Sequence, residues 1–332
     1  MKKKVTLFDV AQAAGVSPST VSRIVAGTAR VSEKKRKQVE EAIAKLKYQP
    51  NLVAKGLVQG RTLSLGVLTQ DIASPFYGAA LLGIQEALRG TDYIPVFTDG
   101  HWQPEDEAQA IQRLMGRIDG LIIMGGHLEG DSLSAIAESM PIISIGRTIP
   151  GFEHHCVLID NYQGAKNIVH YLFELGHRRI AHISGPADHA DALERLKGYH
   201  DAHKEFGIEV DERLIVQGDF QEASGSLAIA TLLETRANFT AIFASNDQMA
   251  YGARLALYRR GIRVPEEISL VGFDDTRTSE YMMPPLTTVR QPMYELGLLA
   301  AQSLLTLLDG EDVTLEKITP QLVIRESASR AR

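Results

Sequence analysis

The chain has 332 residues, of which 44% are hydrophobic and 23% are charged, as is usual for a globular protein. This length predicts two or three domains. The single cysteine, Cys156, excludes a disulfide framework and a zinc site built from several cysteines. The start, MKKKVTLFDVAQAAG, lacks the long apolar segment of an export signal, and no apolar run reaches the roughly 18 residues of a membrane span. We therefore expect a cytoplasmic protein without a membrane partner.

The net charge of −6 is distributed unevenly along the chain. Residues 1–61 carry 13 Lys and Arg against 4 Asp and Glu, a net charge of +9, and the remainder carries −15. A small basic segment joined to a large acidic body is typical of a DNA-binding module attached to a second function. A solvated charged arm would have the same charge, so the local pattern has to distinguish the two.

Three short helices are predicted in the basic segment. Thr6 suits the N-cap of the first helix and Asp9 its N3 position, which together make a capping box. A second helix restarts after Gly15 in "SPSTVSRIVAG", with Ser17 as N-cap and Pro18 at the first helical position. The residues of this helix expected to point inward are Val21, Ile24 and Val25. A third helix, expected to begin after an N-cap at Ser32 and to end before Pro50, has apolar residues at helical spacing.

Two short helices across a glycine-containing turn, supported by a third, make a helix-turn-helix. Its second helix enters the major groove, where the arginine at that helix, Arg23, can bridge N7 and O6 of guanine. The basic run "KKRK" (34–37) is better placed for phosphate contacts. A plain three-helix packing unit is the alternative, and the capping signals together with the concentrated basic charge favour DNA binding.

The basic segment also resembles a known family. "TLFDVAQAAGVSPSTVSRIVAG", followed by "VSEKKRKQVEEAIAKLKYQPNLVAKGL", is similar to the headpiece of the LacI/GalR (lactose-repressor/galactose-repressor) transcription factors. The resemblance implies a helix-turn-helix headpiece over residues 1–50 and a hinge helix with linker over 51–61. In that family the hinge folds when two copies meet at the centre of a palindromic operator.

The hinge stretch "PNLVAKGLVQG" (50–60) is too short for a stable isolated helix, since helices below roughly 12–15 residues are marginal in water. By position, the resemblance makes Leu57 a wedge in the minor groove, on the same helix as Ala54 and Lys55. The alternative for Leu57 is an ordinary core contact. Family members usually have arginine in place of Lys55, which leaves that minor-groove contact open. The complete predicted set of DNA-contacting residues is Thr6, Ser17, Pro18, Ser19, Thr20, Ser22, Arg23, Ser32, Asn51, Ala54, Lys55 and Leu57.

From residue 62 onward, short apolar strands alternate with helical stretches. Strands are predicted at 63–70, 93–100, 118–126, 141–146, 157–161, 179–185, 214–220, 241–247 and 268–275. Near-continuous apolar strands alternating with helices predict parallel sheets covered on both faces, and two successive series predict two similar lobes.

This body resembles the periplasmic-binding-protein-like core of the same family, in stretches such as "GHRRIAHISGP", "FTAIFASNDQMAYGA" and "PPLTTVRQP". The expected fold class is α/β: an N-terminal helix-turn-helix headpiece and a two-lobed core with two doubly wound parallel sheets. The resemblance implies an effector-binding and dimerisation core over 62–332, in which lobe 1 spans about 62–160 and 291–319. Lobe 2 then spans about 161–290 and 320–327. A ligand between the lobes agrees with the rule that open α/β sheets bind ligands beyond the carboxyl ends of their strands.

Polar and aromatic residues near the predicted strand ends suit a ligand with several hydroxyl groups. Asp247 and Asp275 stand among them, with helix capping as the alternative. The resemblance implies effector contacts for Arg195, Asn246 and Asp274, and packing against a sugar ring for Phe76, Tyr77 and Phe220. Arg147 and Gln291 complete the predicted effector set. The histidines, including the pair His154–His155, show no metal-ligand spacing, so no metal and no cofactor is expected.

We therefore expect a homodimeric repressor of carbohydrate-utilisation genes that a sugar or sugar derivative releases from a pseudo-palindromic operator. A corepressor or a non-sugar effector on the same fold is the open alternative. A sugar-binding protein without DNA function would have no use for the basic headpiece. An enzyme is not expected, because no G-x-G-x-x-G follows the first core strand and no phosphate-binding loop is present. The end, "QLVIRESASRAR", lacks a leucine heptad segment, which predicts a dimer rather than a tetramer.

Overall fold

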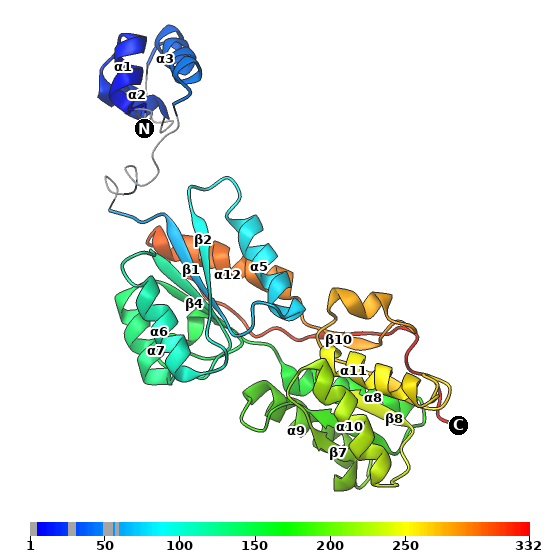
Figure 1. The fold of residues 1–332 in the computed structure, drawn as a ribbon. Helices are drawn as coiled ribbons and strands as arrows, with labels where there is room; N and C mark the ends of the chain where they lie inside the picture. Colours follow the sequence, from blue (N-terminus) through cyan, green and yellow to red (C-terminus); the bar gives the residue numbers. More distant parts are fainter. Residues whose placement is uncertain (1–4, 26–30, 49–55, 57–59) are drawn as a thin grey trace. The chain divides into compact units, whose positions relative to one another are not determined.

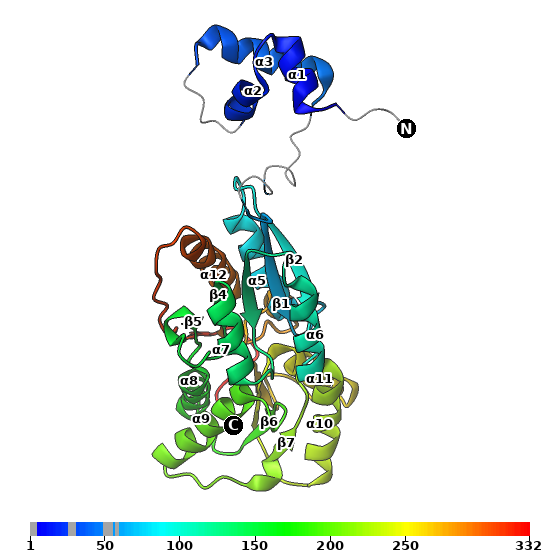
Figure 2. The same cartoon turned by 90° about the vertical axis from the view of Figure 1, so that its left-hand side faces the viewer.

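The computed structural model describes residues 5–25, 31–48, 56 and 60–332. The chain divides into two compact units (Figures 1 and 2). The first comprises Met1–Ser64 with Gly116–Asp119, and the second comprises Leu65–Met115 with Gly120–Arg332. In the described part of the chain, no helix is both long and apolar enough to cross a membrane.

The first unit is built on three helices. They are α1 (Leu7–Ala14), α2 (Pro18–Val25) and α3 (Glu33–Leu46). Residues three and four apart on each helix meet in one small core, which consists of Val10, Ala11, Val21, Ile24, Val39 and Ala42. The three predicted helices are confirmed.

The helix ends follow the local sequence signals with two exceptions. The predicted capping box at Thr6 and Asp9 is present in both directions, and Ser17 Oγ accepts a hydrogen bond from the N–H of Thr20 at 3.2 Å. Ser32 stands at the N-cap of α3, but its side chain makes no capping hydrogen bond to a described residue. The inward orientation predicted for Val25 is also wrong: as the last residue of α2 it lies beyond the packed turns and is 36% exposed.

Lobe 1 of the second unit contains a five-stranded sheet in the order β2-β1-β3-β4-β5. Its strands are β1 (Ser64–Thr69), β2 (Ile94–Asp99), β3 (Gly120–Met124), β4 (Ile142–Ile145) and β5 (Cys156–Val157). Strands β1, β3, β4 and β5 pair in parallel. The helices of this lobe are α5 (Pro75–Ala87), α6 (Pro104–Leu114), α7 (Gly130–Ser139) and α12 (Met293–Leu308), with the 3-10 helix η1 (Glu153–His155) before β5. Helix α12 comes from late in the chain and packs beside α5 (Figure 1).

Lobe 2 repeats this plan with a four-stranded parallel sheet in the order β7-β6-β8-β9. Its strands are β6 (Ile180–Ser184), β7 (Ile215–Gln217), β8 (Ala241–Ala244) and β9 (Ser269–Val271). Its helices are α8 (Asn161–Glu174), α9 (Ala190–Glu205), α10 (Glu222–Glu234) and α11 (Asp247–Arg259), with the 3-10 helices η2 (Glu212–Leu214) and η3 (Arg277–Tyr281). The predicted α/β fold with parallel sheets in two lobes is confirmed.

Strand β8 shows why these strands are apolar throughout. Ala241 and Phe243 pack into the core beneath α8 and α9, whereas Ile242 and Ala244 pack into the core beneath α10 and α11. Successive side chains of a strand point to opposite faces, so a sheet covered on both faces buries every position.

Three segments join the lobes, and they lie close to one another. The first follows β5, the second leads from β10 (Thr288–Arg290) to α12, and the third leads from α12 to β11 (Gln321–Val323). Strands β10 and β11 pair antiparallel, and an isolated parallel bridge joins Ile159 to Ile318. The lobes are therefore connected by neighbouring segments rather than by one flexible tether.

Several observed strands are shorter than predicted. The strand expected at 157–161 ends at Val157, because Asp160 already caps α8 by accepting a hydrogen bond from Gln163 N. The strand expected at 268–275 ends at Val271. In both places the residues after the strand end take part in the joints between the lobes.

Glycines allow the main helix pair of each lobe to pack closely. A Cβ added to Gly297 of α12 would lie 2.0 Å from the carbonyl oxygen of Ala80 in α5, and one added to Gly83 would lie 2.0 Å from that of Tyr294. In lobe 2, a Cβ on Gly252 of α11 would lie 1.8 Å from the carbonyl oxygen of Glu222 in α10. Each helix pair therefore packs backbone against backbone.

We predict that Gly297→Ala destabilises the core. The added methyl group meets rigid backbone, so the cost should reach the upper end of the roughly 1–3 kcal/mol typical of overpacking. Gly78→Ala on α5 is the matched control, because a Cβ there meets nothing within 4 Å and Ala is the better helix former by about 1 kcal/mol. Urea unfolding of both variants would measure the difference, and equal stability of the two would contradict the packing argument.

Candidate functional site

The polar face of α2 is the candidate nucleic-acid surface of the first unit. The helix buries Val21 and Ile24 while it exposes Ser19, Ser22 and Arg23. A recognition helix requires this arrangement, because its apolar face holds it on the supporting helices while its polar side chains reach base edges.

The other predicted DNA contacts of this unit are placed around the same helix. The hydroxyl of Ser17 lies 2.9 Å from that of Ser19 and 2.8 Å from that of Thr20. Thr6 is exposed, whereas Pro18 and Thr20 are half-buried. The predicted contacts in the hinge lie outside the described residues, and they are Asn51, Ala54, Lys55 and Leu57.

The first turns of α3 carry the basic run Lys34, Lys35, Arg36 and Lys37, all exposed. Positive side chains at a helix N-terminus are unfavourable for the helix itself, because the helix dipole is positive at that end. The same cluster of cations at a helix N-terminus attracts phosphate. The basic run is therefore better explained by contact with the phosphate backbone of DNA than by a contribution to the stability of α3.

The second unit contains a cavity of about 510 Å³ between its lobes. Strand ends of both sheets form its wall. Gln70 follows β1 and Arg147 follows β4 in lobe 1, whereas Asn246 follows β8 and Asp274 follows β9 in lobe 2. The cavity therefore lies at the carboxyl ends of two parallel sheets, where open α/β folds bind ligands.

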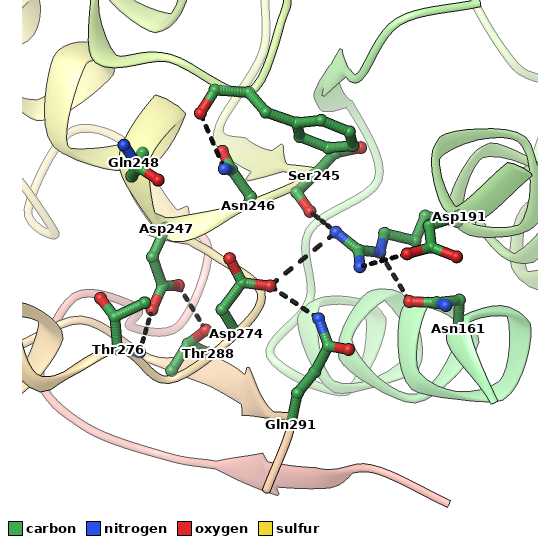
Figure 3. A network of polar contacts seen from close by, with 12 residues as sticks. Asn161, Asp191, Ser245, Asn246, Asp247, Gln248, Asp274, Thr276, Thr288 and Gln291 are labelled. Atoms are coloured by element: carbon green, nitrogen blue, oxygen red, sulfur yellow. Dashed lines mark hydrogen bonds and ion pairs between the residues drawn. The ribbon is translucent and has the colours of Figure 1, made fainter. Parts of the chain in front are cut away.

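Seven of the eight predicted effector residues line this cavity, namely Phe76, Tyr77, Arg147, Arg195, Phe220, Asn246 and Asp274. Gln291 is the exception. It is not among the described lining residues, and its Nε2 instead donates a hydrogen bond to Asp274 Oδ1 at 2.7 Å (Figure 3). The structure thus places Gln291 as a support for the Asp274 carboxylate.

Arg195 brings a buried positive charge to the cavity wall, with 3% of its surface exposed. Its Nε donates to Asn161 Oδ1 at 2.9 Å and its Nη1 to the carbonyl of Ser245 at 2.6 Å. The carboxylates of Asp191 and Asp274 each lie 3.9 Å from the guanidinium. A buried charge is tolerated only with such partners, so the guanidinium is held in one orientation.

Asp274 occupies a strained position opposite Arg195. Its φ of +124° is rare for a residue with a side chain, and Phe220 (φ +68°) and Trp102 (φ +58°) at the cavity also have positive φ. Burial raises the pKa of Asp274 well above its ordinary value, although the charge of Arg195 opposes this. Backbone strain of this kind collects at functional sites, because the surrounding structure has to enforce it.

Asn246 lines the cavity and also caps a helix, whereas its neighbour Asp247 is buried among hydroxyl groups. Asn246 is the N-cap of α11: its Oδ1 accepts from Met249 N at 2.9 Å, and its Nδ2 donates to the carbonyl of Phe220 at 2.9 Å. Asp247 is therefore not the N-cap. Its buried carboxylate accepts hydrogen bonds from Thr276, Ser279 and Thr288, and burial raises its pKa to about 7.

Asp275 is likewise not a helix cap. Its carboxylate forms ion pairs with Arg290 at 2.7 Å and with Arg325 at 2.6 Å. These partners stand on β10 and on the segment after β11, so Asp275 joins the end of lobe 2's sheet to the segments that connect the lobes.

Sequence reasoning missed an aromatic wall that crosses the cleft. Trp102 in lobe 1 contacts His127 at a ring-centroid distance of 5.4 Å and His189 of lobe 2 at 4.5 Å. His189 in turn contacts Phe220 at 5.1 Å. The one available signal was that Trp102, the only tryptophan of the chain, stands two residues after a predicted strand.

Glu107 holds in place a loop of lobe 1 that lines the cavity, at Gly126 and His127. The side chain is fully buried and accepts hydrogen bonds from the backbone N–H groups of His127 at 2.7 Å and Leu128 at 2.9 Å. A Cβ added to Gly126, whose φ is +98°, would lie 2.5 Å from the Glu107 carboxylate. The loop after β3 is thus fixed through its backbone by one buried carboxylate.

Comparison with known proteins identifies both units. Residues 6–51 match the family model described as bacterial regulatory proteins, lacI family, and residues 169–328 match a periplasmic binding protein-like domain. The chain is 37% identical to the HTH-type transcriptional regulator GalR of Escherichia coli K12, over 330 residues that cover 98% of this chain and 96% of GalR. The chain belongs to the LacI family of bacterial regulatory proteins.

Solved structures of this LacI family agree with the arrangement described above. The lac repressor dimer bound to operator and the anti-inducer ONPF has a TM-score of 0.86 and 32% identity, covering 98% of this chain and all of that chain. The transcriptional regulator CelR in complex with cellobiose has a TM-score of 0.72 and 34% identity, with the same coverage. This LacI-family chain is a DNA-binding transcriptional regulator, and the relatives named here are regulators rather than enzymes.

A buried histidine, His182, and a half-buried one, His189, make the core of this LacI-family regulator sensitive to acid. Burial lowers the pKa of His182 to about 3 and that of His189 to about 4, from an ordinary value of 6.5. Between pH 6.5 and pH 4 the unfolded chain therefore binds protons that the folded chain does not. Stability is fully present above the unfolded pKa and falls as the pH decreases through this window.

We predict that His189→Asn removes part of this acid sensitivity. Asn retains an acceptor for the N–H of Asp191, which His189 Nδ1 now caps, but it does not titrate. The slope of the free energy of unfolding against pH should decrease by up to about 1.4 kcal/mol per pH unit, measured by urea unfolding between about pH 5 and pH 6.5. The exposed His101 offers a control, His101→Asn. An unaltered slope in His189→Asn would show that this ring is not kept neutral by burial.

Proposed function

We propose that this regulator is a homodimeric repressor, released from a pseudo-palindromic operator when an uncharged sugar or glycoside binds between the lobes of its core. The observation that carries the proposal is the cavity, in which buried polar groups face an aromatic wall across the cleft. Because a regulator of this kind acts on chromosomal DNA, the proposed location is the cytoplasm. Carbohydrate-utilisation genes are the proposed targets.

The charges of the cavity favour an uncharged ligand over a sugar phosphate. Among the described lining residues there are five aspartates, namely Asp71, Asp188, Asp191, Asp219 and Asp274, and only two arginines, Arg147 and Arg195. The charge of Arg195 is already matched by two of these carboxylates. A phosphate would enter a cavity with excess negative charge, whereas hydroxyl groups can donate to carboxylates without that penalty.

The aromatic wall favours a ring with an apolar face. Trp102 and Phe220 stand at opposite lobes, joined through His189, so a ligand in the cavity contacts rings from both. The cavity volume of about 510 Å³ lies within the range of sites for small molecules. CelR, the relative whose structure holds cellobiose, supports a saccharide as the ligand class.

The end of the linker offers a route from the core to the headpiece. The N–H groups of Thr62 and Leu63 donate to the carboxylate of Asp119 at 2.7 Å and 2.9 Å, and the Thr62 hydroxyl donates to it at 2.9 Å. Asp119 directly precedes β3, whose other end reaches the cavity at Gly125. We infer that movement of lobe 1 is passed to residues 51–61 through this anchor.

Dimerisation is supported by an apolar surface on lobe 2. Tyr258 is 69% exposed on α11, and Tyr281 (69%) and Met283 (83%) are exposed on η3 and just after it. Exposed aromatic and Met side chains of this kind are enriched at interfaces. The lac repressor structure to which the chain is similar is a dimer on operator DNA. Two headpieces would then read two half-sites in successive major grooves.

We predict that Arg23→Ala removes the preference for operator over unrelated duplex while it leaves sugar binding unchanged. The loss should be about 1–3 kcal/mol per half-site, the value of one bidentate contact to guanine. Arg89→Ala is the control, since Arg89 is an exposed arginine of the core that forms an ion pair with Glu86 at 2.9 Å. DNA binding would be measured at several salt concentrations, because phosphate contacts alone give salt dependence without specificity. Full operator preference in Arg23→Ala would remove this residue from the recognition surface.

We predict that hexoses or glycosides raise the melting temperature of the wild-type protein and change the fluorescence of Trp102, whereas the corresponding sugar phosphates do neither. A ligand that binds only the folded state stabilises it by mass action. Asp274→Asn should abolish both responses and still bind operator, and Asp131→Asn on the exposed part of α7 is its control.

The effect of an identified sugar on operator binding then decides between the two modes of regulation. Weaker operator binding in its presence supports release by an inducer, and tighter binding establishes the corepressor alternative. A response to sugar phosphates alone would contradict the charge argument.

A further inference from the structure

Two histidines and an aspartate form a cluster on lobe 1. Nε2 of His155 lies 3.4 Å from Asp312 Oδ1, and Nε2 of His154 lies 3.8 Å from the same oxygen. The three ligand atoms all lie within 4.8 Å of one another. None of these residues is among the described residues that line the cavity between the lobes. The cluster is therefore separate from the proposed effector site.

The backbone brings this cluster together from distant parts of the chain. His154 and His155 end η1, directly before β5, which pairs with β4 in the sheet. The N–H of Leu315 donates to the carbonyl of His154 at 2.9 Å, which holds the segment that carries Asp312 against η1. The two imidazole rings lie 4.1 Å apart by their centroids. The convergence thus depends on main-chain contacts as well as on side-chain orientation.

We propose that His154, His155 and Asp312 bind a divalent transition-metal ion such as Zn²⁺. Two imidazole nitrogens and one carboxylate oxygen form a donor set that leaves a coordination position open to water. With metal–ligand distances of about 2.0–2.2 Å, the ligand atoms around one ion lie roughly 3.3–3.6 Å apart. His155 and Asp312 already have this spacing. His154, with 41% of its side chain exposed, has room to move inward.

The chemistry of the donors selects the class of ion. Imidazole nitrogen suits Zn²⁺, Cu²⁺ and Ni²⁺, whereas Mg²⁺ and Ca²⁺ require oxygen ligands. The sequence alone did not reveal this donor set, because Asp312 stands more than 150 residues after the adjacent pair His154 and His155.

An ion at this place would join η1 to the third segment that connects the lobes. That segment also contacts the first connection, through the bridge between Ile159 and Ile318 and the ion pair between Lys317 and Asp160 at 3.2 Å. A metal bound only in the folded state would therefore stabilise lobe 1 where two of its connections begin.

The test uses the tag-free full-length protein and Zn²⁺ in a buffer that does not chelate metals. Calorimetric titration should give one ion per chain, and Zn²⁺ should raise the melting temperature. His154→Gln and Asp312→Asn should each weaken Zn²⁺ binding by at least about tenfold, the lower end of what even outer-shell changes cause. Both side chains are substantially exposed, 41% and 79%, so these variants are expected to fold.

His170→Gln is the matched control, because His170 also pairs with a carboxylate, Glu205 at 3.0 Å, without a second histidine in the pair. It should bind Zn²⁺ like the wild type. Absence of stoichiometric binding to the wild type would overturn the proposal, and so would equal binding by His154→Gln, Asp312→Asn and the control. Neither result depends on the identity of the effector, so the outcome is independent of the proposed function.

Discussion

The buried contact between Arg195 and Asp274 is the constraint on which the core depends. A guanidinium with 3% of its surface exposed has to be compensated by nearby acceptors, and the structure provides these from α8, from the end of β8 and from the end of β9. Asp274 is also bound through its backbone to the connection between the lobes, since its N–H donates to the carbonyl of Val289 and its carbonyl accepts from Gln291 N. The group that would meet a ligand is therefore part of a joint between the lobes.

This arrangement couples recognition to lobe movement without a long chain of contacts. The helices within each lobe are packed backbone against backbone at Gly297 and Gly252, so each lobe is suited to move as a rigid body. Across the cleft, by contrast, side chains meet, as in the contact between Trp102 and His189 and the hydrogen bond from Ser74 to Gln248 at 3.0 Å. Rigid bodies with side-chain contacts between them are the usual basis of hinge or shear closure.

The division of charge separates the two partners of the protein. The first 61 residues have a net charge of +9, while the rest has −15. Because DNA repels the acidic core and attracts the basic headpiece, the electrostatic field itself restricts DNA contact to the headpiece. The carboxylates that line the cavity likewise repel anions, and they therefore disfavour an anionic ligand.

The sequence by itself determined the elements. Capping residues and apolar periodicity are local, so the three helices of the headpiece, the capping box at Thr6 and the apolar strands of both sheets were predictable, as was the exposure of Arg23. Most of the predicted effector residues do line the cavity, because residues at the carboxyl ends of parallel strands, such as Asn246 and Asp274, meet at one edge of a sheet.

Only the tertiary structure decided which distant residues act together. The pairing of Trp102 with His189, the support of Asp274 by Gln291 and the approach of Asp312 to His154 and His155 join segments far apart in sequence. Their proximity results from how the lobes and their connections pack, and local spacing carries no information about it. For the same reason Asp247 and Asp275, which resembled helix caps, are buried acceptors and ion-pair partners instead.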